Sequence, residues 1–275
     1  MIMFIGIQTW SRRMKEKKIE LIDELAKWNS IQQSVNYDRN IAKQMSLFSA
    51  LAYLSDNKQT VKQHLKSYKV SKLAYFDVDG TEAMLFKSGK SIVIAFRGTE
   101  PTELKDVVAD LNLFPTKGEK QGMVHRGFAG ALDNIWDDVE RVLDETYTKG
   151  DIVYFTGHSL GGALATVAAA RSKYIGQVYT FGQPRVGTKK YCQSVKSKFY
   201  RHVHGADIVP SVPFGLLYTH MGEYIHVEMD NTTQLTSAWK IFKTRWKSRW
   251  NSFFSRRPLL KLIADHDIIL YYKNI

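Results

Sequence analysis

Apolar residues in the first quarter of the chain recur at intervals of three and four. This spacing places them on one face of a helix, because an α-helix has about 3.6 residues per turn. It predicts helices over residues 15–28, 36–53 and 60–68. We expect the first two to cover one face of a sheet that later residues form.

After residue 70 the pattern changes to short runs of β-branched and aromatic residues, which is typical of strands. The first three runs are separated by Asp79-Gly80 and by residues 87–90, both hairpin signals, so the sheet is predicted to begin antiparallel. From residue 150 onward strand-like runs alternate with helical segments, which favours parallel βαβ units. The predicted strands are 72–78, 82–86, 91–96, 151–156, 177–181 and 199–204, and the predicted helices between them are 125–147, 162–171 and 189–196. The predicted class is therefore α/β, with a mostly parallel central sheet, an antiparallel N-terminal part and helices on both faces.

The composition suits a single globular domain. A chain of 275 residues that is 44% hydrophobic can bury a full core, and we expect one domain over residues 1–275. Within it, residues 1–70 form a helical cover and residues 72–275 the core. The single cysteine, Cys192, excludes an internal disulfide. The net charge of +12 fits a nucleic-acid partner, an anionic membrane or simple solubility, and its distribution has to decide among these.

The beginning of the chain is apolar over residues 1–10, and basic residues follow this segment instead of preceding it. That order differs from a cleavable signal peptide, and no run approaches the roughly 18 apolar residues of a membrane span. We expect a cytoplasmic protein, or one exported by a route without a cleavable signal, with peripheral membrane contact as a further option.

The sequence Gly157-His158-Ser159-Leu160-Gly161 stands between a predicted strand and an Ala-rich predicted helix. A sharp strand-to-helix turn strains its central residue, and glycine is needed where neighbouring side chains would collide. Such a turn presents the serine beside the free N–H groups and partial positive charge of a helix N-terminus. These groups suit a developing oxyanion, so we predict that Ser159 is the nucleophile of an acyl-transfer site. The pattern alone also fits a serine that only caps a helix, and the flanking elements decide between the two.

A serine hydroxyl needs a base, and the base needs an orienting group. In α/β-hydrolase-like chains the acid and then the histidine follow the serine. Asp207 follows a predicted parallel strand, in a loop with Gly, Ala and Pro, and is the predicted acid. Asp230 is the alternative, although the polar Asn-Thr-Thr segment after it is typical of an exposed turn. We predict His266, at the start of an apolar terminal segment, as the base, and expect His158 to point away from the nucleophile.

Six motifs from about residue 72 onward occur in an order that resembles the fungal-type class 3 lipase family. They are Phe96-Arg97-Gly98-Thr99, His125-Arg126-Gly127-Phe128, Gly157-His158-Ser159-Leu160-Gly161-Gly162-Ala163-Leu164-Ala165, Thr180-Phe181-Gly182-Gln183-Pro184-Arg185-Val186-Gly187, Asp207-Ile208-Val209-Pro210 and Asp265-His266. The resemblance implies an α/β-hydrolase fold with the same three catalytic residues.

The resemblance also implies an oxyanion hole made by the backbone N–H groups of Thr99 and Leu160. It implies that the segment after Thr99 is a lid, and residues 100–111 fit as an amphipathic lid helix over an apolar acyl groove. The apolar positions of this segment are Leu104, Val107, Val108 and Leu111.

A basic and aromatic stretch over residues 239–257 departs from the family pattern. Lys and Arg surround its aromatic residues, and residues 231–264 contain no Asp or Glu. The aromatic positions Trp239, Phe242, Trp246 and Trp250 recur at helical spacing. Two interpretations stay open: a helix that lies on an anionic membrane, and a helix that packs its aromatic face on the core with Lys and Arg outside. Nucleic-acid binding is disfavoured because no recognition motif occurs.

These observations predict a serine hydrolase of lipid carboxylic esters, first of all a triacylglycerol lipase, that needs no metal or cofactor. The alternatives are a phospholipase A1-type enzyme acting on anionic membranes and a non-catalytic lipid-binding module on the same fold. The expected partner is the lipid ester substrate, with contact to an anionic membrane surface as an option. The sequence indicates no oligomeric state.

Overall fold

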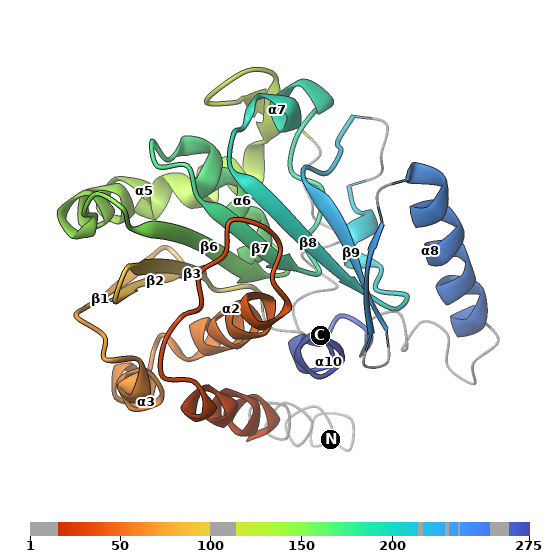
Figure 1. Ribbon diagram of the computed structural model, residues 1–275. Coiled ribbons are helices and arrows are strands. Elements are labelled where there is room, and N and C mark those ends of the chain that lie inside the picture. Colours follow the sequence, from red (N-terminus) through yellow and green to blue (C-terminus); the bar gives the residue numbers. More distant parts are fainter. Residues whose placement is uncertain (1–15, 100–113, 214–216, 229–230, 236, 254–263) are drawn as a thin grey trace, which may run out of the picture.

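The central feature of the molecule is a mixed sheet with helices on both faces (Figure 1). The structure, a computed structural model, describes residues 16–99, 114–213, 217–228, 231–235, 237–253 and 264–275. Over these residues the main sheet has eight strands in the order β1-β2-β3-β6-β7-β8-β9-β10. A separate two-stranded sheet pairs β4 with β5.

The first strands form hairpins, as the turn signals predicted. β1 (Lys72–Val78) pairs antiparallel with β2 (Thr81–Ser88), and β2 with β3 (Ser91–Phe96). The next neighbours are parallel: β3 with β6 (Ile152–His158), then β7 (Gln177–Phe181), β8 (Lys198–His204) and β9 (Glu223–Glu228). The predicted antiparallel start and parallel continuation are confirmed.

The sheet ends in an antiparallel edge strand that the sequence pattern did not predict. β10 (Asn231–Leu235) pairs with β9, so the Asn-Thr-Thr segment is a strand and the predicted exposed turn is wrong. Polar residues suit this position because an edge strand has only one paired side. Asp230 itself lies outside the described residues. The small hairpin of β4 (Pro115–Lys117) and β5 (Met123–His125) was also not predicted, since three-residue strands carry almost no periodicity.

The N-terminal helices cover one face of the sheet, as expected. Residues 16–23 are helical and continue into a short 3₁₀ turn. Asp38 caps α2 by accepting the N–H groups of Asn40 and Ile41. The helical elements of this region are η1 (Glu24–Lys27), α2 (Arg39–Leu51), η2 (Ala52–Leu54), α3 (Lys58–His64) and η3 (Lys66–Tyr68).

The remaining helices follow the strands that they connect or extend. They are α5 (Arg126–Thr146), α6 (Leu160–Arg171), α7 (Lys189–Ser194), η4 (Val209–Ser211), α8 (Ala238–Phe253) and α10 (Ile268–Asn274). Among the described helices, none combines the length and the apolar character needed to cross a bilayer.

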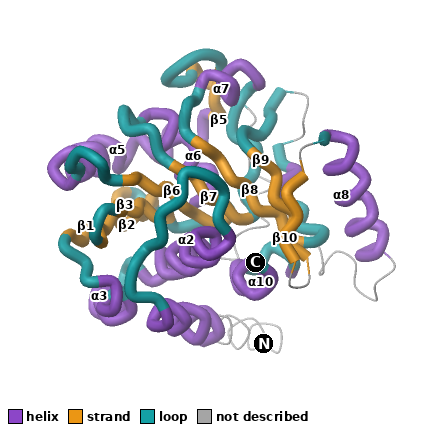
Figure 2. Tube along the Cα trace, viewed as in Figure 1, coloured by secondary structure: helices purple, strands orange, loops and turns teal. Residues whose placement is uncertain are grey.

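Two apolar clusters fill the space between the layers. α2 and α10 pack on one face of the sheet, whereas α5 and α6 pack on the other (Figure 2). α6 is apolar all round and almost wholly buried, because α5 covers the side that faces away from the sheet. This arrangement holds the carboxyl end of β6 and the first residue of α6 in fixed relation.

One buried histidine makes the stability of this core sensitive to pH. His202 on β8 stacks on Phe181, with ring centroids 4.8 Å apart, and its Nδ1 lies 3.2 Å from the carbonyl oxygen of Thr180. Burial lowers the pKa of His202 to about 3. The folded chain therefore keeps this ring neutral at pH values where an unfolded chain protonates it.

We expect the free energy of unfolding to fall between pH 7 and pH 5, with His202 accounting for about 2 kcal/mol of the loss. His202 takes up a proton below about pH 6.5 in the unfolded state and only near pH 3 in the folded state. Protonation of His202 between these pH values therefore stabilises the unfolded state alone. Urea unfolding at both pH values measures this. The variant His202→Gln should lose about 2 kcal/mol less than the parent, and an equal loss in both proteins would contradict the assignment.

Candidate active site

Ser159 occupies a strained turn between β6 and α6. Its backbone has φ 59° and ψ −127°, a positive φ that only a few non-glycine residues of the described chain adopt. The N–H of Ser159 donates to the carbonyl oxygen of Phe181, at 2.9 Å, which ties the turn to the end of β7. The predicted nucleophile elbow is thus present at the carboxyl end of a buried parallel strand.

Glycine is required on both sides of this serine by direct contacts. A Cβ atom at Gly157 would lie 2.2 Å from the carbonyl carbon of Gly161, and one at Gly161 would lie 2.2 Å from the carbonyl oxygen of Phe96. Both neighbours are backbone atoms, which cannot move aside as a flexible side chain does. The turn therefore closes only because strand, helix and the neighbouring β3 approach one another without side chains between them.

Asp207 and His266, which are 59 residues apart in sequence, are hydrogen-bonded to each other. His266 Nδ1 lies 2.8 Å from Asp207 Oδ2, and both side chains are buried. A proton on Nδ1 that donates to the carboxylate leaves Nε2 as the basic nitrogen. Nε2 of His266 is buried and has no hydrogen-bond partner among the described residues. The structure thus brings together the predicted acid and base with the free nitrogen that a general base needs.

His266 lies beside the segment that holds the elbow. Its ring packs against Gly182, where a Cβ atom would be 2.7 Å from two of the ring atoms. Gly182 has φ +63° and directly follows Phe181, whose carbonyl oxygen accepts the N–H of Ser159. A glycine at this position therefore allows the histidine to approach the turn that carries the serine.

Two further hydrogen bonds fix the carboxylate of Asp207. The buried hydroxyl of Tyr271 donates to Asp207 Oδ2 at 2.6 Å, and the N–H of Val209 donates to Oδ1 at 2.9 Å. Burial, together with the charge of Asp207, raises the pKa of Tyr271 well above its ordinary value, so the phenol stays a donor. The carboxylate is held in one orientation toward His266.

His158, the neighbour of Ser159 in sequence, is hydrogen-bonded to the backbone of the predicted base. Its Nε2 donates to the carbonyl oxygen of His266 at 2.6 Å, and its Nδ1 accepts the hydroxyl of Tyr53 at 2.9 Å. Burial lowers the pKa of His158 well below its ordinary value, and the ring is therefore neutral. This chain of contacts connects the N-terminal cover, the elbow and the C-terminal segment.

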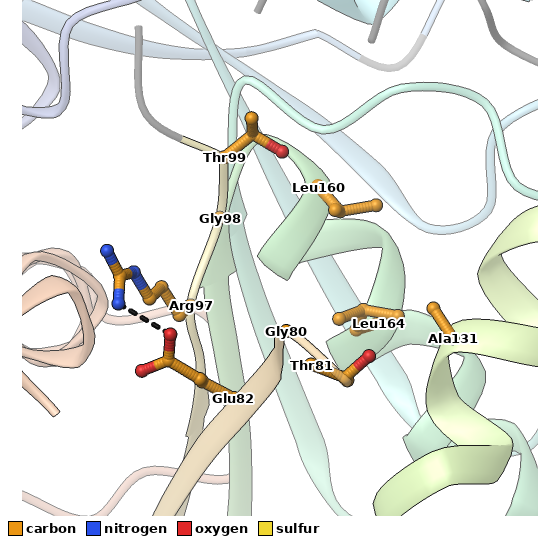
Figure 3. Close-up of a pocket in the computed structure, with 9 residues that line it drawn as sticks. All are labelled: Gly80, Thr81, Glu82, Arg97, Gly98, Thr99, Ala131, Leu160 and Leu164. Atoms are coloured by element: carbon orange, nitrogen blue, oxygen red, sulfur yellow. Dashed lines mark hydrogen bonds and ion pairs between the residues drawn. The ribbon is translucent and has the colours of Figure 1, made fainter. Parts of the chain in front are cut away.

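Thr99 and Leu160, the predicted oxyanion-hole residues, line one pocket of about 200 Å³ (Figure 3). Leu160 is the first residue of α6, where the backbone N–H has no carbonyl one turn earlier to bind. Figure 3 shows Thr99 beyond Arg97 and Gly98. Arg97 Nη1 pairs with Glu82 Oε1 at 2.5 Å, which anchors that segment to β2. Both predicted residues therefore flank the same space beside the elbow.

Known proteins share both the sequence and the architecture of this region. Residues 93–216 match the family profile described as lipase (class 3). The chain is 34% identical over 167 residues to a lipase of Rhizopus niveus, an alignment that covers 54% of this chain and 42% of that protein. The resemblance of this part of the chain to the class 3 lipase family is therefore confirmed.

Solved lipases extend this likeness to the three-dimensional structure. A lipase from Rhizopus microsporus var. chinensis superimposes with a TM-score of 0.63 at 26% identity, over 86% of this chain and 90% of that one. A triacylglycerol lipase whose catalytic centre is formed by a serine protease triad gives a TM-score of 0.60 at 26% identity, over 74% and 86%. The predicted α/β-hydrolase fold is confirmed. The chain spans about two fifths of the length of the Rhizopus niveus relative.

Three residues of the candidate site escaped sequence reasoning. Tyr53 lies in the N-terminal cover, and Tyr271 stands beside Tyr272 with no sequence feature to separate the two. Arg245 was assigned only to a basic stretch, yet it reaches the backbone oxygen of Asp207 at 3.4 Å and Ser211 Oγ at 2.6 Å. Hydrogen-bond partners of this kind leave no periodic trace in a sequence.

Other predicted positions have a mixed outcome. The lid positions Leu104, Val107, Val108 and Leu111 lie outside the described residues. Trp239, Phe242, Trp246 and Trp250 are exposed on α8, so their side chains do not form the packed core face that was one of the two interpretations. Among the described residues, no group of His, Cys, Asp and Glu is arranged to hold a metal ion.

The elbow should not tolerate a single methyl group at Gly161. The variant Gly161→Ala would place Cβ against the backbone of Phe96, and we expect it to lower the free energy of unfolding by about 3 kcal/mol. Gly130→Ala is the matched control, because Gly130 lies in α5 and a Cβ atom there would meet no other atom within 4 Å. It should raise that free energy by about 0.5–1 kcal/mol. Equal effects of the two changes, measured by chemical denaturation, would contradict this account.

Proposed function

We propose that the protein hydrolyses carboxylic esters of lipids through Ser159, His266 and Asp207. The observation that carries the proposal is the hydrogen bond between His266 Nδ1 and Asp207 Oδ2, which leaves a buried basic nitrogen close to a strained serine turn. The match of residues 93–216 to the lipase (class 3) profile supports it, as does the likeness to a lipase with a serine protease triad.

In the proposed reaction Ser159 Oγ attacks the ester carbonyl carbon while His266 Nε2 takes the hydroxyl proton. The negative charge on the former carbonyl oxygen is stabilised by the N–H groups of Thr99 and Leu160. His266 then gives its proton to the leaving alcohol oxygen, which leaves an acyl group on Ser159. Water, deprotonated by His266, attacks this acyl group, and the carboxylic acid leaves as Ser159 regains its proton.

Asp207 lowers the energy of the protonated form of His266 during both steps. Its buried carboxylate faces the imidazolium that each proton transfer creates, and the opposite charges attract strongly in a buried site. Tyr271 and the N–H of Val209 stabilise the carboxylate in turn. The base and the acid therefore work as a unit whose geometry is set before the substrate arrives.

Triacylglycerol is the first candidate substrate. Relatives that are named lipases support a lipid ester as the substrate. The proposed steps require only the ester group of an acylglycerol. A phospholipid acyl ester is the second candidate, because α8 presents exposed Lys and aromatic residues that suit an anionic lipid surface. A non-catalytic lipid-binding module is disfavoured, since such a module would not need serine, histidine and aspartate together.

Labelling of Ser159 by a fluorophosphonate tests the proposed chemistry. We expect rapid covalent labelling of the parent chain and none at this position in Ser159→Ala, because only an activated serine attacks phosphorus. Mass spectrometry of the labelled peptide identifies the residue. Ester hydrolysis by Ser159→Ala at the parent rate would rule the mechanism out.

The substrate class is separated by comparing a triacylglycerol emulsion with vesicles of phosphatidylcholine and of anionic phospholipid, with Ser159→Ala as the blank. Faster release of fatty acid from the emulsion supports the lipase assignment. Faster release from the anionic vesicles would replace it with a phospholipase, and no release from any of them in the presence of an intact fold would remove the lipid-ester proposal.

Tyr271→Phe should lower kcat/KM for a soluble ester by about tenfold, because it removes one charge-assisted hydrogen bond from Asp207. Tyr272→Phe is the matched control, since the hydroxyl of that neighbour binds Glu24, away from the site. Steady-state kinetics of both variants, beside their denaturation midpoints, separate an effect on the site from an effect on folding. Equal rates for the two variants would show that Tyr271 does not position the acid.

A further inference from the structure

Helix α8 carries a continuous row of exposed aromatic residues. Trp239, Phe242, Trp246 and Trp250 follow one another at intervals of three and four and are 70%, 56%, 57% and 53% exposed. Neighbouring ring centroids lie 5.9 to 6.1 Å apart, and the rings are nearly parallel. At 1.5 Å per residue the row is roughly 17 Å long. Large exposed apolar strips of this kind mark a binding surface.

The other side of α8 attaches the helix to the molecule. Arg245 donates to Ser211 Oγ at 2.6 Å and to the backbone oxygen of Asp207 at 3.4 Å. Ile241 is half-buried, in contrast to the aromatic positions. Figure 2 shows α8 beyond the edge of the sheet that β10 forms, and α8 contacts this strand. The aromatic row is therefore not what holds the helix in place.

Positive charge lies along one flank of the row. Lys240, Lys243 and Lys247 are exposed, and their spacing places them on one side of the helix next to the aromatic residues. Residues 231–264 contain eight Lys and Arg residues and no Asp or Glu. Trp side chains favour the headgroup region of a bilayer, and Lys favours anionic headgroups. The two side-chain types therefore select the same kind of surface.

We propose that this α8 surface, formed by Trp239, Phe242, Trp246, Trp250, Lys240, Lys243 and Lys247, docks the protein on a lipid surface that carries anionic headgroups. The aromatic rings enter the headgroup region, and the lysines bind phosphate and carboxylate groups around them. A nucleic acid fits less well, because the sequence contains no nucleic-acid recognition motif. Docking does not depend on the proposed hydrolysis, since Ser159 takes no part in it.

The position of Arg245 relates this surface to the site. Arg245 ties α8 to the loop that carries Asp207. A lipid surface bound by α8 therefore lies on the same side of the molecule as the start of that loop. The proposed docking helix and the acid of the site are thus connected by one side chain.

Vesicle sedimentation tests the proposal, with Ser159→Ala as the parent so that the vesicles are not consumed. We expect binding to vesicles of phosphatidylcholine mixed with phosphatidylserine and much weaker binding to phosphatidylcholine alone. The double variant Trp239→Ala/Trp246→Ala should bind the mixed vesicles at least tenfold more weakly, roughly the effect of losing two large apolar contacts. The triple variant K240Q/K243Q/K247Q should bind the mixed vesicles about a hundredfold more weakly than the parent, near fivefold per charge removed. This difference in affinity should shrink as the salt concentration is raised.

Matched controls change the same residue types elsewhere. Val35→Ala/Ile175→Ala removes apolar groups that are 71% and 68% exposed away from α8, and K62Q/K189Q/K190Q removes three exposed charges from other helices. Both should bind the mixed vesicles as the parent does, with all denaturation midpoints alike. No binding of the parent, or unchanged binding of both α8 variants, would overturn the proposal. The proposal would also be overturned if the α8 variants changed their sedimenting mass without losing vesicle binding. The aromatic row would then be a contact between two copies of the chain.

Discussion

The backbone contact between the elbow and its neighbours is the constraint on which the site depends. Ser159 holds a positive φ only because β3, β6 and α6 meet at Gly157 and Gly161 with no side chain between them. A strained backbone conformation at a single residue persists where several contacts with the surrounding structure hold that residue in place. Here the parallel strands supply one boundary and the almost wholly buried α6 supplies the other, so the unfavourable local backbone is offset by a large apolar core on both sides of the sheet.

A buried polar network extends this constraint to distant parts of the chain. Tyr53 binds His158, His158 binds the backbone of His266, and His266 and Tyr271 bind the same oxygen of Asp207. Each buried donor or acceptor would cost free energy without its partner, so the network specifies how the N-terminal cover and the C-terminal helix meet the elbow. The one nitrogen that this arrangement leaves without a partner among the described residues, Nε2 of His266, is the atom that the proposed chemistry uses.

Sequence reasoning reached most of the fold, because hydrophobic period and turn residues are local signals. The strands 72–78 and 91–96 and the elbow were predicted at their observed bounds, and Asp207 and His266 were chosen from their loop context and from motif order. β10 was missed because a polar edge strand lacks the alternation that marks a half-buried one. Tyr53, Tyr271 and Arg245 were missed for a different reason. Their roles depend on which side chains meet across 38 to 105 residues of sequence, and a single sequence does not record such pairs.

Helix α8 illustrates the same limit at the level of a whole surface. Its spacing predicted an amphipathic helix correctly, but an aromatic stripe has the same period whether it packs inward or faces solvent. The tertiary contacts distinguish these two cases, because Arg245 points to the loop that carries Asp207 whereas the aromatic rings of α8 are exposed. An inward-facing basic residue and an outward-facing aromatic row reverse the usual distribution of polarity in a globular protein. That reversal costs free energy in water, and contact with an apolar and anionic phase would offset it. The same helix can therefore be unfavourable for the isolated fold and favourable for a protein whose substrate lies in a lipid surface.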